Sequence, residues 1–140
     1  MSDTVEILLK KIREPGIELP TALGEIDLHN FADFHRLQYE TDGHLSLMWL
    51  ASTPREFNLG KRAIKQAVVK FREVSQLIIT PRDPDTPRSE DRTLEEFELM
   101  EITGDHCHLA FTFLGGFKVD VTAAHVELLV DWEYPGPGKR

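Results

Sequence analysis

Three histidines in the last third of the chain are the side chains with the most readily assigned chemistry. His106 and His108 stand two positions apart in a segment that alternates apolar and polar residues. On a β-strand such side chains share one face about 6.7 Å apart, and two imidazoles at that spacing can hold a metal ion together. His125 is expected two strands away, about 9.6 Å at the backbone, whereas metal chemistry usually needs three ligands and an open position. We therefore expect solvated histidines and no metal site, and keep His106, His108 and His125 as the ligands of an alternative.

Cys107 is the only cysteine and lies between two of these histidines. Alternation sends its side chain to the opposite, apolar face, which predicts a buried, unreactive thiol and no Cys–His pair. The sequence has no Gly-x-Ser-x-Gly or His-Glu-x-x-His motif, and Gly60-Lys61 lacks the upstream glycine of a phosphate loop because that position is Arg55. The sequence thus predicts no catalytic residue and no cofactor, and favours a protein that is not an enzyme.

The net charge of −8 is concentrated in one segment. Asp83 to Asp105 holds nine acidic residues and two arginines. An acidic chain repels phosphate backbones, so nucleic-acid binding is disfavoured, whereas carboxylates can steer a basic protein partner. A solvated polar surface is the other interpretation of the segment. The candidate partner-binding residues are Asp83, Asp85, Glu90, Asp91, Glu95 and Glu96.

The elements that must position these residues are antiparallel strands. Residues 106–114, 117–122 and 125–134 alternate at period 2, with Trp132 and Tyr134 on the apolar side. Directly opposite residues of an antiparallel pair point to the same side, so parity sets the length of each hairpin loop. Three-residue loops at 41–43 and 114–116 place Tyr39 opposite Leu45 and Phe111 opposite Val119, with Gly43 in a left-handed position.

Two segments suggest helices. Val5, Leu8, Leu9 and Ile12 repeat at helical spacing before Pro15-Gly16, which predicts an amphipathic helix over about Thr4–Arg13. In Lys61–Thr80, apolar residues fit either a helix near 61–74 or two short strands broken near Arg72-Glu73, and both stay open. The fold class predicted is α+β, mainly antiparallel β, as a meander sheet or partly open barrel.

The prolines and turn residues divide the rest of the chain. Residues 81–92 hold three prolines and no apolar residue, which predicts an exposed loop, and the shift of parity within 93–103 predicts a bulge. We expect one domain over residues 1–134 and a flexible tail over 135–140.

The sequence favours a cytoplasmic location away from membranes. It has a single cysteine, no apolar run near 20 residues and a charged N-terminus.

The apolar spacing supplies one resemblance. Phe71-x-x-Val74-x-x-Leu77-x-Ile79 and Gly116-Phe117-x-Val119-x-Val121-x-Ala123-x-x-Val126-x-Leu128 look like small β-rich bacterial proteins, some of which are immunity proteins that block toxins. The resemblance implies strands over 61–80 and transfers no functional residue.

Three functions follow as hypotheses. The first is a non-enzymatic cytoplasmic protein that binds another protein, a basic one such as a toxin, through Asp83–Asp105. The second is a small-ligand or metal-binding β-barrel that uses the histidines. The third is a self-associating structural protein that pairs exposed strand edges, with a homo-oligomer as the result.

Overall fold

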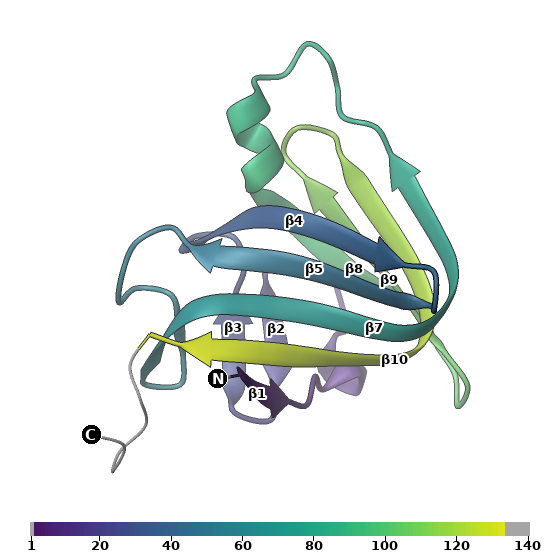
Figure 1. Cartoon of the computed structure of the whole chain (residues 1–140), viewed down its shortest axis with the longest axis horizontal. Helices are drawn as coiled ribbons and strands as arrows, with labels where there is room; N and C mark the ends of the chain where they lie inside the picture. Colours follow the sequence, from purple (N-terminus) through teal and green to yellow (C-terminus); the bar gives the residue numbers. More distant parts are fainter. Residues whose placement is uncertain (1, 134–140) are drawn as a thin grey trace.

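The computed structural model describes residues 2–133, and its main elements are antiparallel strands (Figure 1). The main sheet has the order β4-β5-β7-β10-β9-β8, with β1 paired to β10 and β6 paired to β7, and β2 and β3 form a separate pair. The strands are β1 Ser2–Val5, β2 Glu18–Thr21, β3 Gly24–Asp27, β4 Ala32–Glu40, β5 His44–Ala51, β6 Asn58–Leu59, β7 Arg62–Thr80, β8 Leu94–Ile102, β9 Cys107–Phe113 and β10 Lys118–Trp132. Two 3-10 turns, η1 Leu9–Lys11 and η2 Arg88–Arg92, complete the described elements.

Two long strands form the middle of the sheet. β7 and β10 pair from Lys118↔Thr80 to Trp132↔Ile64. Each is longer than its other neighbours: the free side of β7 carries β5 and β6, and the free side of β10 carries β9 and β1. In the main path β4-β5-β7-β10-β9-β8, the two halves of the sheet are therefore joined by strand pairing only through β7 and β10.

Both long strands bend at the same level. On β7, Ser75 is an extra residue between the partners of Thr122 and Ala123, and Glu73 has a φ of 53°. A bulge and a left-handed residue both turn a strand sharply. The β4–β5 hairpin contacts the bend, because the Val74 N–H donates to the Gly43 carbonyl at 3.0 Å. Gly43 itself has a φ of 92°, which favours glycine.

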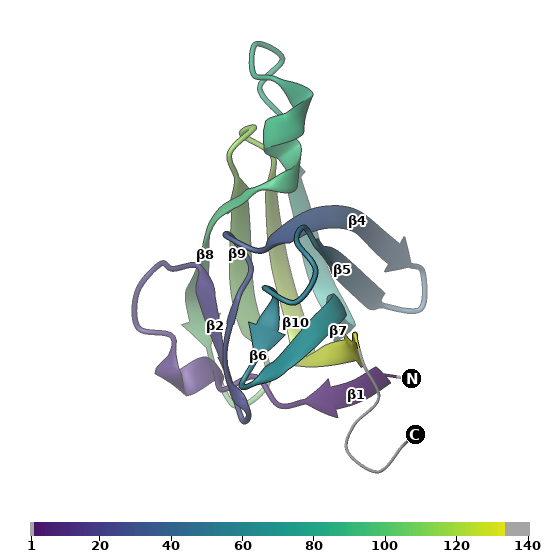
Figure 2. The same ribbon diagram turned by 90° about the vertical axis from the view of Figure 1, so that its left-hand side faces the viewer.

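The bend curls the sheet, as Figure 2 shows, and buried aromatic side chains fill its core. Trp49, Phe71, Phe111 and Phe113 are fully buried, with ring centroids 5.9 Å apart for Trp49 and Phe111 and 6.3 Å apart for Phe71 and Phe111. Leu19 and Ile26 of the β2–β3 pair belong to the same core. The segment before β2 joins the outer strand β8, where Gly16 and Phe97 exchange backbone hydrogen bonds of 3.0 and 2.8 Å.

The predicted hairpin registers are confirmed. Tyr39 pairs with Leu45 and Phe111 pairs with Val119, and Gly43 takes the expected positive φ. The bulge predicted in 93–103 is also present, as a register shift between Leu99 and Glu101. Antiparallel β structure is therefore confirmed as the main feature of the fold.

The predicted N-terminal helix over Thr4–Arg13, and with it the α+β class, is wrong. Ser2–Val5 is a strand on β10, Val5 and Ile7 are buried at strand spacing, and only the turn Leu9–Lys11 is helical. A helix of ten residues is marginal without tertiary packing, whereas the free side of β10 offers a ready hydrogen-bonding edge.

The helix considered near 61–74 is also wrong, and the alternative of two broken strands becomes one bent strand. Lys65 is an extra residue opposite the Asp131–Trp132 step, so the core positions Ile64 and Ala67 fall three residues apart. The bulge at Lys65 thus produces the i, i+3 spacing of Ile64 and Ala67 that imitates the start of a helix.

The remaining expectations concern the ends of the chain and the membrane. The tail over 135–140 and Tyr134 lie outside the described residues, while Trp132 is half-buried under the Arg62 guanidinium, 3.9 Å from its ring centroid. Among residues 2–133, no helix has the length and apolar character to cross a membrane.

We predict that Phe111→Ala lowers the free energy of unfolding by about 3–5 kcal/mol, because it opens a cavity among the rings of Trp49, Phe71 and Phe97. Chemical denaturation measures this change. Leu114→Ala, at a side chain that is 42% exposed, is the control and should shift stability by less than about 0.5 kcal/mol. Equal losses in the two variants would contradict the core described here.

Candidate functional site

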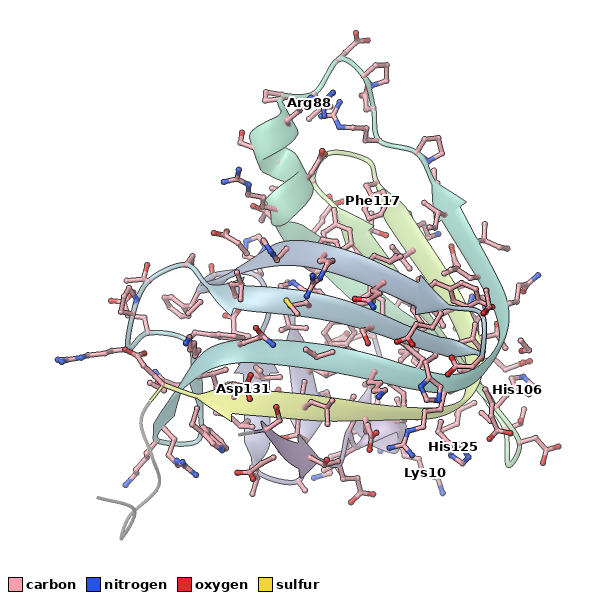
Figure 3. All side chains as sticks on the ribbon, viewed as in Figure 1. Lys10, Arg88, His106, Phe117, His125 and Asp131 are labelled. Atoms are coloured by element: carbon pink, nitrogen blue, oxygen red, sulfur yellow. The ribbon has the colours of Figure 1, made fainter. Side chains whose placement is uncertain are left out.

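The three candidate histidines lie at separate places, each with its own carboxylate. His106 Nε2 lies 2.7 Å from Glu101 Oε1, His108 Nε2 lies 3.0 Å from Asp120 Oδ1, and His125 Nε2 lies 3.2 Å from Glu73 Oε2. Within the described chain no group of three or more His, Cys, Asp or Glu side chains could hold a metal ion. Figure 3 shows His106 and His125 at the end of the sheet away from the long loop. The structure therefore does not bring the three histidines together as one ligand set.

Cys107 is buried at the start of β9. Burial raises the pKa of its thiol above the ordinary value, because desolvation disfavours the thiolate. A neutral, buried thiol is a poor nucleophile.

The six candidate acids fall into three structural groups. Asp83, Asp85 and Glu90 belong to the loop 81–93, in which η2 lies. Asp91, on η2, pairs with Arg82. Glu95 and Glu96 lie on β8, which ends the sheet, and charged residues on an outer strand discourage pairing with another chain. The Asp83 carboxylate accepts a hydrogen bond from the Asp85 N–H at 2.9 Å, so among these six acids the side chains of Asp85 and Glu90 are left without an evident structural role.

The loop projects beyond the sheet and is held by specific contacts (Figures 1 and 2). Arg82 donates from Nε to Asp91 Oδ2 at 2.8 Å and from Nη2 to the Thr86 carbonyl at 2.6 Å. The Asp83 N–H donates to the Gly115 carbonyl at 2.8 Å, and the Leu114 N–H donates to the Thr93 carbonyl at 3.0 Å. Both ends of the loop are thus fixed to the β9–β10 turn.

An open groove of about 800 Å³ runs between this loop and the neighbouring ends of β4 and β5. Three arginines line its loop side, and two aromatic rings line its apolar part. The lining residues are Asp33, Phe34, His35, Leu50, Ala51, Pro81, Arg82, Arg88, Asp91, Arg92 and Phe117. Asp83, Asp85 and Glu90 are not among them, so the fold separates the basic side chains of the loop from most of its acids.

Sequence reasoning missed this groove. It treated Arg88 and Arg92 as a minority in an acidic segment and gave Arg82, Phe34 and Phe117 no functional role. The available signal was the spacing of Arg82, Arg88 and Arg92 in a loop with three prolines. The spacing of these arginines indicates a binding groove only once β4 is known to lie opposite the loop.

Comparisons with known proteins found a solved structure with a similar fold. No protein-family model matches the chain, and no curated protein matches it. The chain is similar to a crystal structure of an uncharacterized protein from Neisseria gonorrhoeae, with a TM-score of 0.50 and 10% identity, over 83% of this chain and 97% of that one. At such identity the likeness shows a shared fold and assigns no residue a role.

We predict that Cys107 reacts at least tenfold more slowly with a thiol reagent near pH 8 than a cysteine placed at exposed Ser75 in a Cys107→Ser background. The raised pKa keeps the thiolate fraction low, so the rate should rise as pH increases further. Absorbance of the released chromophore measures both rates, and denaturant should make them equal. Equal rates in the folded proteins would contradict the buried placement.

A second prediction concerns the loop. Asp91→Asn removes the charged acceptor of Arg82, and trypsin should then cut after Arg88 and Arg92 about fivefold faster, the factor for an ion pair worth about 1 kcal/mol. Limited proteolysis followed by mass spectrometry measures the cutting rate. Asp85→Asn makes the same chemical change at an exposed side chain of the same loop and should leave the rate unchanged. Equal acceleration by both variants would show that the ion pair does not hold the loop.

Proposed function

We propose that this protein acts by binding another protein, without catalysis, and that the outer side of the loop 81–93 is part of the contact surface. The observation that carries the proposal is the shape of this loop, which extends beyond the sheet while its ends are fixed to the β9–β10 turn. A preformed loop loses less conformational entropy on binding than a flexible one.

The charge of the loop favours a basic partner. Asp83 and Asp85 are exposed, Glu90 is half-buried, and the side chains of Asp85 and Glu90 have no ion pair among the described residues. Carboxylates presented in this way attract a cationic surface and raise the rate of association at low salt. The resemblance to immunity proteins favours, as this partner, a toxin with a cationic nucleic-acid-binding cleft.

The proposal is tested by charge reversal. Asp85→Lys with Glu90→Lys should slow association with a basic protein captured by the wild type roughly tenfold, because it removes the steering charge. Raising the salt from about 0.15 M to about 0.5 M should weaken the wild-type complex and have less effect on the variant. Surface plasmon resonance measures both effects.

Glu6→Lys with Glu40→Lys is the matched control. Both side chains are exposed and far from the loop in the sequence, and the change in net charge is the same. If this control loses association as strongly as the loop variant, net charge alone explains the binding and the loop is not the contact surface.

A further inference from the structure

The groove beside the loop has the chemistry of a second, independent binding site. Its volume of about 800 Å³ lies within the range of about 300–1,000 Å³ that is typical of small-ligand pockets. It is formed by segments far apart in the sequence: β4, the end of β5, the loop with η2, and Phe117 just before β10. Figure 3 shows Arg88 on the loop and Phe117 at the neighbouring hairpin.

The arginines of the groove differ in their contacts. The guanidinium of Arg82 is engaged by Asp91 and by the Thr86 carbonyl. Within residues 2–133, Arg88 and Arg92 have neither an ion pair nor a side-chain hydrogen bond, and both are exposed. Arg82 thus fixes the loop, while two guanidinium groups stay available for a ligand.

The groove is electropositive in an acidic protein. Among its lining residues three arginines outnumber Asp33 and Asp91 by one charge, while the whole chain carries −8. Since Asp91 is neutralised by Arg82, Asp33 is the acid that remains to oppose Arg88 and Arg92. Guanidinium groups bind carboxylates and phosphates through paired hydrogen bonds, which favours an anionic ligand.

The apolar part of the groove is aromatic. The rings of Phe34 and Phe117 lie with centroids 6.4 Å apart at 32°, and both rings pack on Phe113, at 4.5 and 5.5 Å. Phe113 is fully buried, so the two lining rings rest on a rigid base. Such rings offer a planar apolar surface on which another ring can stack.

We propose that the groove binds a small organic anion, with its carboxylate or phosphate on Arg88 and Arg92 and its planar apolar body on Phe34 and Phe117. Leu50 and Ala51 add apolar contact from β5. This site is separate from the protein contact proposed above, because it uses the opposite set of loop charges.

Titration followed by amide NMR tests the site with four probes: benzoate, phenyl phosphate, neutral benzamide and inorganic phosphate. Benzoate and phenyl phosphate should shift the amides of Phe34, His35, Arg88 and Phe117. Benzamide and inorganic phosphate should each bind roughly tenfold more weakly or not at all, since each lacks one half of the recognised chemistry.

Arg88→Gln with Arg92→Gln should weaken benzoate binding roughly tenfold or more. Lys61→Gln with Lys65→Gln removes the same charge from exposed residues outside the groove and should leave the binding unchanged. Dispersed amide spectra establish that both variants fold.

Three results overturn the anion site: no shift with either aromatic anion, benzamide binding as tightly as benzoate, or equal losses in the two double variants. The variant with Asp85→Lys and Glu90→Lys should bind benzoate as the wild type does or more tightly. The two experiments therefore test the anion site and the protein contact surface independently, so either proposal can be rejected without rejecting the other.

Discussion

The pairing of β7 with β10 is the interaction on which the rest of the structure depends. These strands run together from Ile64 to Thr80 and from Lys118 to Trp132, and every other strand of the main sheet is attached to one of them directly or through a neighbour. These strands contribute side chains that are fully buried, among them Val69, Phe71, Val121 and Leu128. Hydrogen bonding along the ladder and burial of apolar surface therefore act on the same two segments, so a change here would disturb both halves of the sheet.

The bend in β7 and β10 divides the main sheet into two parts that run in different directions. Glu73 pays a backbone penalty for its positive φ, and the bulge at Ser75 leaves one residue out of the ladder. Beyond the bend, the ends of β7 and β10 lead to the loop 81–93 and the β9–β10 turn, which project away from β4 and β5 (Figure 1). The groove lies between the loop and the ends of β4 and β5. The hydrogen bond from the Val74 N–H to the Gly43 carbonyl fixes the turn of the β4–β5 hairpin to the bend.

The hairpins could be predicted from the sequence because local parity determines them. Only a three-residue loop puts Phe111 opposite Val119, and the structure has that pairing. The helix near 61–74 could not be excluded in the same way, since the bulge at Lys65 inserts one residue and turns strand spacing into i, i+3 spacing. At the N-terminus, Val5 and Ile12 fit a helix equally well until the free edge of β10 is known.

The groove could not be predicted from the sequence at all. Its residues come from β4, the end of β5, the loop 81–93 and the residue before β10, which are far apart in the sequence and lie together only in the folded sheet. A count of charges along 83–105 also treats the loop as one acidic surface. In the structure, Arg88 and Arg92 line the groove, whereas Asp83 and Asp85 lie outside it. A short loop can therefore be acidic in composition and still present a basic surface, because binding responds to the direction of each side chain and not to the sum of their charges.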